Sequence, residues 1–369
     1  VQQRTEYAPA GDALVVLNDY TYFSTVNSID LSGFFTVGAE LGDHNRLSYN
    51  WMLLRSTTDL TQRQQGFNRD AEGGDVQFTE LEWLERELIA NQFLGEHSFP
   101  SLWDLKLDWN FTTATAETVE PDTRTYRYDP DTLTPEEDDL IFSLRNDSNQ
   151  RRWGELQDNS DDWNINLIQP FPLGERMDFD IRFGLGNMER DRDSGLRRFA
   201  FRSKGPISGD VDLRRNLNPE DVIYDETIAP RGWQLGEVTI ATDAYTADQT
   251  IDSGYFAVDF MLDEWLRLGG GLRREKSRQS VTTFDQFDPD RNPVVSDLKT
   301  EDLLSSLSAT LIFGDHQIRA GYGETTNRPD FKELSEALFK DPLLDRLVKG
   351  NPDPVSYTHL RAHETERLI

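Results

Sequence analysis

The sequence lacks cysteine, a long apolar run and a recognisable leader. None of its 369 residues is cysteine, so disulfides have no part in the fold, although this excludes few classes of protein. No run of about 18 apolar residues exists, which excludes a membrane-spanning helix. The first residues, Val1 to Arg4, lack the charged and apolar regions of a secretory signal. We therefore expect the chain to begin partway into a longer protein.

Positive charge is scarce as well. The chain has 38 Lys and Arg against 67 Asp and Glu, a net charge of −29. Because phosphate binding needs clustered Lys and Arg, this balance argues against a nucleic-acid partner. A mean hydropathy of −0.65 is typical of soluble or partly disordered proteins. It does not exclude a membrane β-barrel, however, because a barrel strand shows only half of its side chains to lipid.

What the sequence does contain is strands in which apolar and polar side chains alternate. The clearest run covers residues 255–262, where four apolar side chains share one face: Phe256, Val258, Phe260 and Leu262. A brief connection, Asp263-Glu264-Trp265, leads to a second alternating run that begins at Leu266. Two such runs across a tight link predict a β-hairpin. The same alternation recurs at 47–53, 105–111, 179–185 and 303–313.

The connections between these strands differ in length at the two ends. Short glycine-led turns are expected at Gly42-Asp43-His44, Gly95-Glu96-His97, Gly174-Glu175-Arg176 and Gly314-Asp315-His316. Long polar connections are expected at 59–76, 116–156, 191–250 and 282–298. Short turns at one rim and long loops at the other are typical of bacterial outer-membrane barrels, whose long loops face outside the cell.

We therefore predict an all-β fold, an antiparallel transmembrane β-barrel that is incomplete. The chain supplies about ten strands, whereas a plugged transporter barrel has about 22. Open strand edges would leave backbone groups unpaired in lipid, so the complete protein should supply more strands. Many of the 40 aromatic residues lie near predicted strand ends, where aromatic girdles meet the membrane interface.

No catalytic, cofactor or metal site is expected. Three of the four turns contain a histidine, and each of these histidines lacks a second metal ligand at a useful spacing. We interpret them as turn residues. Glu85 and Glu87 share one strand face but have no nearby nucleophile or oxyanion donor. One residue conflicts with the pattern: Arg274 continues the apolar face of Leu266 to Leu272. We expect it at the outer rim, or after a bulge, because Arg at the membrane midplane costs about 2–4 kcal/mol.

The segment from Arg319 to Leu334 resembles a motif of a known family. It contains Thr325-Thr326-Asn327-Arg328-Pro329-Asp330-Phe331-Lys332-Glu333-Leu334 and is followed by Gly350-Asn351-Pro352-Asp353. This resembles the barrel of TonB-dependent receptors, in which a late strand reading Thr-x-x-Arg-Pro-x-Phe-x-Glu-Leu leads into a Gly-Asn-Pro loop. Weaker likenesses are Trp83-Leu84-Glu85-Arg86, Pro121-Asp122 and Gly271-x-Arg273-x-Glu275-x-Ser277. Small departures are Gly323, where Ser is frequent, and Pro354, where Leu is usual.

The resemblance spans residues 29–353 and implies the function. It implies a 22-stranded barrel with an N-terminal plug in the outer membrane, taking up siderophore-bound iron, cobalamin or glycans with energy delivered through TonB. The expected partners are the lipid bilayer, a small nutrient and, through the missing plug region, the TonB complex. The motif residues are assigned to structure or to a loop, with no binding role given: Arg328, Pro329, Phe331, Glu333, Leu334, Gly350, Asn351 and Pro352.

The last residues call for a separate interpretation. Residues 354–369 leave both the strand pattern and the family pattern, and they resemble adapter-derived read-through at the ends of unrelated metagenomic chains. We expect residues 1–353 to be barrel and 354–369 to be a non-native tail. Two rival classes stay open: a soluble or surface glycan-binding β-sandwich, whose apolar faces would meet in a core, and a passive porin-like channel.

Overall fold

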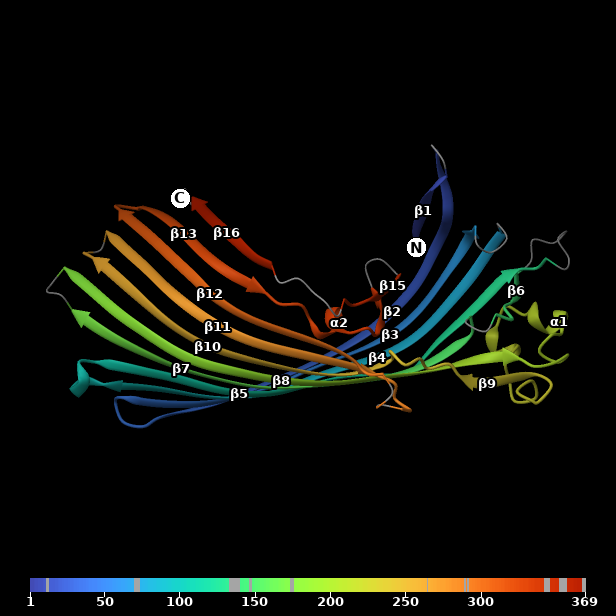
Figure 1. Cartoon of the computed structure of the whole chain (residues 1–369), viewed down its shortest axis with the longest axis horizontal. Helices are drawn as coiled ribbons and strands as arrows, with labels where there is room; N and C mark the ends of the chain where they lie inside the picture. The colour runs from blue at the N-terminus through green and yellow to red at the C-terminus, as the bar shows by residue number, and fades with distance from the viewer. Residues whose placement is uncertain are drawn as a thin grey trace.

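The computed structural model describes residues 1–10, 13–69, 74–132, 140–145, 148–172, 176–263, 265–288, 290, 292–341, 346–351 and 357–366. Most of them belong to one antiparallel sheet (Figure 1). No helix among these residues is long and apolar enough to cross a membrane.

Most of the sheet follows the order of the chain. Its strands are β1 (Gln2–Ala10), β2 (Ala13–Glu40), β3 (Asn45–Asn68), β4 (Gly74–Phe99), β5 (Leu105–Pro130), β6 (Leu140–Phe142), β7 (Gln150–Pro172), β8 (Met177–Ser203), β9 (Trp233–Glu237), β10 (Ala244–Leu262), β11 (Leu266–Phe284), β12 (Val294–Phe313), β13 (His316–Asn327) and β16 (Tyr357–Glu366). Consecutive strands pair along this path, while β6 pairs only with β5 and β9 only with β8. A separate hairpin joins β14 (Leu338–Asp341) to β15 (Arg346–Lys349).

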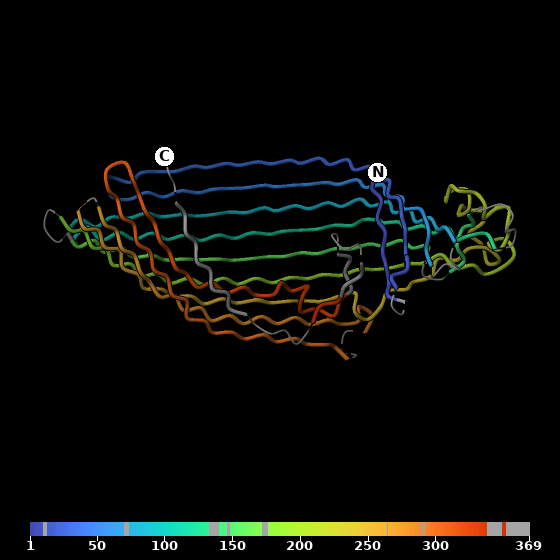
Figure 2. Tube along the Cα trace, turned by 90° about the horizontal axis from the view of Figure 1, so that it is seen from above, coloured from blue at the N-terminus to red at the C-terminus, as the bar shows by residue number. Residues whose placement is uncertain are grey.

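Four short helical segments complete the described chain. They are the turns of 3₁₀ helix η1 (Pro100–Leu102) and η2 (Pro219–Asp221), and the α-helical turns α1 (Val211–Arg214) and α2 (Phe331–Leu334). The sheet curves into an open trough, and α2 lies on its concave side (Figures 1 and 2). The predicted antiparallel all-β fold is therefore confirmed, and among the described residues the sheet does not close. Its 14 strands exceed the expected ten, because β1, the short β6 and β9, and β16 were not predicted.

Strand pairing brings the predicted apolar sets onto one face of the sheet. The registers join five neighbouring strands in one row: Leu272, Phe256, Phe183, Leu167 and Leu107. The polar sets share the opposite face, which is the face that α2 contacts. The apolar rows therefore lie on the convex side, which we call the outer face, and the concave side is the inner face.

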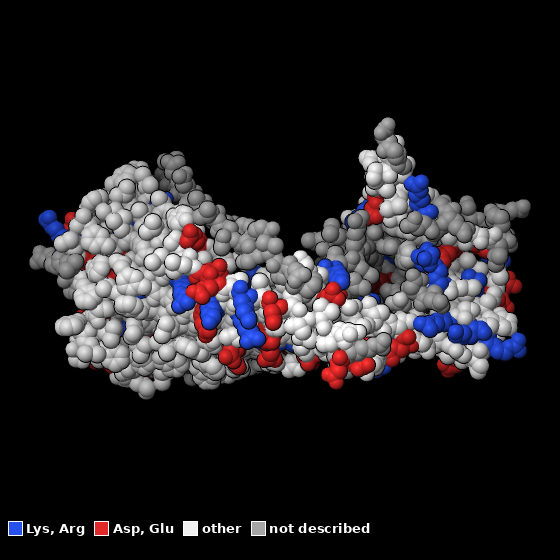
Figure 3. All heavy atoms as spheres, viewed as in Figure 1, with Lys and Arg blue, Asp and Glu red and all other residues white. Residues whose placement is uncertain are grey.

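The outer face carries a band of exposed apolar side chains. We call it the apolar belt and define it by Ile165, Leu167, Phe183, Leu185, Phe256, Leu268, Leu272, Leu303, Leu307 and Leu311. No part of the chain that the structure describes covers these residues, and Leu185 and Leu303 are 64% and 65% exposed. Figure 3 shows a broad surface without charge at the end of the sheet where the short turns lie. The rows thus do not meet in a core, which excludes the β-sandwich.

Charged residues begin at the edge of the belt, where Arg274 is in register with Leu303. Arg274 follows Leu272 on the outer face of β11, and its Nη2 lies 2.6 Å from Oε1 of Glu301. Neither pairing of β11 contains a register shift, so no bulge precedes Arg274. Because membrane strands need only about 9–11 residues, the 19-residue β11 extends well past the belt.

Two of the predicted turns are confirmed and one is wrong. Gly42 and Gly314 lie between paired strands with φ of +68° and +59°, values that glycine adopts without strain. Gly95 instead lies inside β4, where it pairs with Trp109 of β5. Glycine is needed there because a side chain would overlap the indole ring of Trp109. The connection there is formed by residues 100–104. Residues 173–175 of the fourth turn lie outside the described residues.

The predicted boundaries of the long connections are wrong, although the difference between the two rims is confirmed. Many of the residues expected in loops continue the strands, and the connections shrink to 69–73, 131–149, 204–243 and 285–293. The boundaries predicted for the loops lie where the alternation of apolar and polar residues ends in the sequence. Beyond the belt, ion pairs replace apolar contacts between the side chains of neighbouring strands. The pair of Arg151 and Asp122 is an example.

The tail contains a strand that was not predicted. Residues 357–366 form β16, which pairs with β13 in antiparallel register from Asn327↔Tyr357 to Ile318↔Glu366. An open strand edge offers unpaired N–H and C=O groups, so an extended segment can add to it through its backbone alone. Pairing of this kind does not depend on the side-chain pattern, and the non-native origin of 354–369 stays a prediction.

Candidate functional site

The predicted motif residues leave the wall of the sheet and fold over its inner face. β13 ends at Asn327, and the next residue, Arg328, points to the wall. Its Nη2 lies 2.8 Å from a carboxylate oxygen of Glu275 and 3.5 Å from one of Asp302. The carbonyl of Pro329 accepts a hydrogen bond from Nε2 of Gln279 at 2.8 Å. The segment after β13 is thereby attached to β11 and β12.

The helical turn α2 is capped and buried against the same wall. Asp330 accepts a hydrogen bond from the backbone N–H of Lys332, an N-cap that satisfies one of the free donors of the turn. Its carboxylate also lies 3.1 Å from Arg192 of β8. Phe331 and Leu334 are each 1% exposed. The guanidinium carbon of Arg192 lies 5.0 Å from the centre of the Phe331 ring, a cation–π contact.

The second half of the motif closes onto the first. The N–H of Asn351 donates to the carbonyl of Glu333 at 2.6 Å. A side chain at Gly350 would overlap the carbonyl oxygens of Ser335, Lys332 and Glu333, so only glycine fits there. The structure thus brings seven of the eight predicted residues into one unit, while Pro352 lies outside the described residues. We call residues 328–337 with 350–351 the inner segment.

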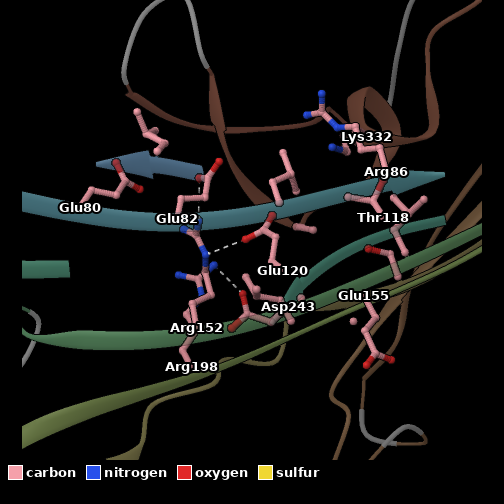
Figure 4. Close-up of a pocket in the computed structure, with 18 of the residues that line it drawn as sticks. Glu80, Glu82, Arg86, Thr118, Glu120, Arg152, Glu155, Arg198, Asp243 and Lys332 are labelled. Carbon is pink, nitrogen blue, oxygen red and sulfur yellow. Dashed lines mark hydrogen bonds and ion pairs between the residues drawn. The ribbon is translucent and has the colours of Figure 1, made fainter. Parts of the chain in front are cut away.

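A cavity of about 760 Å³ lies between the inner segment and the wall (Figure 4). Its floor is formed by β4, β5, β7 and β8, with Lys332 and Ala337 of the inner segment on the opposite side. Its charged lining side chains are mixed in sign: Glu80, Glu82, Glu120 and Asp243, and Arg4, Arg86, Arg152, Arg198 and Lys332. Such a lining suits a polar or charged ligand.

Ion pairs organise one end of this cavity. Arg152 lies 3.2 Å from Glu120 and 4.0 Å from Glu82. Arg198 lies 2.7 Å from Asp243, whose side chain is fully buried in the connection before β10. Burial raises the pKa of the Asp243 carboxyl, while a hydrogen bond from the backbone of Ile240 and the charge of Arg198 act in the opposite direction.

A second cavity, of about 670 Å³, continues the first. The two share Thr118, Leu156 and Lys332. In the second cavity Asp158 binds both Arg190 and Arg192, with N–O distances of 2.6 Å for each. The inner segment therefore lies where the two cavities meet.

Most of the residues that line the cavities were not predicted as site residues. Arg152, Arg190 and Asp158 lie in stretches where apolar alternation is lost and loops were expected in part. The sequence did contain one indication of these residues, which is the polar face of the strands. Even-numbered residues of β7, such as Arg152 and Asp158, lie on that face. Among the described residues, no three His, Cys, Asp or Glu side chains gather as a metal site would require.

Comparison with solved structures gives distant likenesses. The siderophore receptor PiuA from Acinetobacter baumannii shares 8% identity over 88% of this chain and 51% of its own, with a TM-score of 0.42. The ferric-catecholate import receptor Fiu from E. coli K12 shares 10% identity over 87% of this chain and 56% of its own, with a TM-score of 0.42. The chain thus spans about half the length of these structures. No curated protein matches it.

Comparison with protein families gives a match along almost the whole chain. The family described as "TonB dependent receptor-like, beta-barrel" matches residues 10–353. That range includes every strand of the sheet from β2 to β13 as well as the inner segment. The chain therefore belongs to the family of TonB-dependent receptor β-barrels.

Proposed function

We propose that the protein is an outer-membrane receptor that takes up a scarce, small nutrient. One observation carries the proposal: the same strands present an uncovered apolar belt on one face and a charged, hollowed surface on the other. Lipid would contact the belt, and the ligand would pass along the inner face. No chemical reaction forms part of this function.

The source of energy is part of the proposal. In this family uptake is coupled to the inner membrane through TonB, which contacts a plug inside the barrel. We propose that a plug covers the inner face, and that further strands close the open sheet. Unpaired backbone N–H and C=O groups at the free edges of β2 and β16 would otherwise be exposed to hydrocarbon at high cost. We propose a siderophore complex, cobalamin or a glycan as the nutrient, and the charged lining of the cavities favours a polar one.

Fractionation of cells that express the full-length protein tests its location. We expect the protein to sediment with the outer membrane on a sucrose gradient and to need detergent for extraction. Recovery in the buffer-soluble fraction would overturn the proposal.

Uptake measurements test the coupling. Cells expressing the protein are given iron-loaded siderophores, cobalamin or oligosaccharides carrying a radioactive label. We expect accumulation of one of these, and its loss in a host without TonB or after addition of a protonophore. Accumulation that persists in both conditions would identify a passive channel instead.

A further inference from the structure

Apolar side chains form part of the floor of both cavities. We call them the apolar strip and define it by six residues of β4, β5, β7 and β8: Leu84, Leu88, Ala116, Leu156, Met188 and Leu196. The first cavity is lined by Leu84, Leu156 and Leu196. The second cavity is lined by the other three together with Leu156. The strip therefore continues from one cavity into the next.

The strip differs from the inner face nearer the short turns. There the neighbouring strands carry a row of polar side chains, in which Asn50 donates a hydrogen bond to Gln92 at 3.0 Å and Gln92 donates one to Thr112 at 3.4 Å. The side chains of the strip offer no such donors or acceptors, and all six are half-buried rather than covered. Apolar surface in water is unfavourable, so the strip favours contact with an apolar group.

Ion pairs lie beside the strip. Arg152 lies 3.2 Å from Glu120 and Arg198 lies 2.7 Å from Asp243, and Figure 4 shows both pairs at one end of the first cavity. In the second cavity Asp158 binds two arginines of β8. A guanidinium has five N–H donors, so an arginine in an ion pair can still donate to a ligand. The two cavities thus offer polar contacts next to an apolar floor.

The space above the strip has the size of a site for a small molecule. The cavities measure about 760 and 670 Å³, within the range of about 300–1,000 Å³ that is usual for ligand sites. Lys332 and Ala337 of the inner segment line the first cavity from the side opposite the strip. Because the inner segment lies between this space and the lumen, a small ligand fits there better than a folded domain does.

We propose that the apolar strip binds an aryl or alkyl group of the transported ligand. The polar part of the same molecule would contact the arginines beside the strip, so the ligand is amphipathic. This inference rests on the proposed function and narrows it to nutrients that carry an apolar group. Glycans without such a group are thereby excluded.

Saturation-transfer NMR on the full-length protein in lipid nanodiscs tests the strip. The probes are phenyl, hexyl and methyl β-D-glucoside, which share one sugar and differ only in the attached group. We expect phenyl or hexyl glucoside to bind about fivefold or more tightly than methyl glucoside, because only the larger groups bury much apolar area. Comparison of the phenyl with the hexyl compound distinguishes an aryl from an alkyl ligand. Signal from empty nanodiscs is subtracted.

Two variants place an amide of similar size in the strip. Leu156→Asn changes the residue that both cavities share and should remove most of the preference for the apolar probes. Met188→Gln should weaken the preference, and it keeps the test decisive if Leu156→Asn does not fold. Leu304→Asn is the matched control, because Leu304 lies on the inner face of β12 and lines neither cavity. It should bind the probes as the unchanged protein does.

Three outcomes would overturn the inference: equal affinity for all three glucosides, an unchanged preference in both strip variants, or an equal loss in Leu304→Asn. Failure of the proposed function would look different. The purified protein would keep its preference for the apolar probes, but no labelled nutrient would accumulate in cells.

Discussion

At the scale of single residues, the inner segment depends on a glycine that no other residue can replace. Gly350 lies against three carbonyl oxygens of the α2 region, and the neighbouring Asn351 closes the unit through Glu333. Nothing in the residues next to Gly350 reveals this requirement. The family motif marked the position as important, but only the folded chain shows that close backbone packing is the reason.

Substitution of Gly350 should therefore be costly. In Gly350→Ala the added methyl group must push the carbonyls apart, and overpacking of this kind costs about 1–3 kcal/mol. We expect a lower midpoint of denaturant unfolding for the purified protein. Gly323→Ala is the matched control, because no atom lies within 4 Å of the place its methyl group would take. Equal midpoints for the two variants would show that Gly350 is not tightly packed.

The apolar belt gives a second prediction for single residues. In Leu268→Arg a charge faces lipid, at a cost of about 2–4 kcal/mol near the midplane. We expect much less protein assembled in the outer membrane, measured by immunoblot of membrane fractions. Arg267→Gln changes the adjacent residue, which points to the inner face and pairs with Asp259 at 2.9 Å. It should assemble normally, and a similar defect in both variants would argue against the assigned faces.

At the scale of elements, strand identity was predictable but strand length was not. Alternation marked β10 and β11 correctly, because each has one face against lipid and one against water. It fails in the far half of β5 and β7, where charged side chains interrupt the apolar rows and Arg151 and Asp122 form a cross-strand contact. Gly42 and Gly314 were predictable from local turn chemistry, whereas Gly95 depends on Trp109, a partner across the sheet.

The attachment of α2 to the wall gives a prediction for this element. The ring of Phe331 packs against Arg190 and Arg192, and Phe331→Ala should cost about 3 kcal/mol or more, as for other buried Phe residues. We expect the turn to detach and trypsin to cleave faster after Lys332. Phe287→Ala, at a residue 62% exposed, is the control and should leave the rate unchanged. Cleavage at the same rate in both variants would contradict the proposed anchoring.

At the scale of the whole molecule, the two rims should face different compartments. The orientation stays a prediction from loop length, while the curvature and the cavities could not be predicted, because they depend on contacts between residues far apart in sequence. Asp330 and Arg192, for example, are separated by 138 positions. No periodic pattern in the sequence reports a contact of that range.

The absence of cysteine makes the orientation testable. Leu217→Cys places one thiol on the long connection before β10, and Asp315→Cys places one in the turn between β12 and β13. We expect a membrane-impermeant maleimide to label only the first variant on intact cells. Both should react once the outer membrane is permeabilised. Labelling of the Asp315 variant alone on intact cells would reverse the orientation.

The inner segment also acts as a strut. Asp330 forms an ion pair with β8, and Arg328 forms one with β12. The segment therefore spans the four neighbouring strands β8, β10, β11 and β12 of the curved wall. Wall and strut cannot deform independently, because flattening of the arc would pull on both attachments. It would also draw Lys332 away from Arg86. The curvature of the wall and the width of the first cavity are thus coupled.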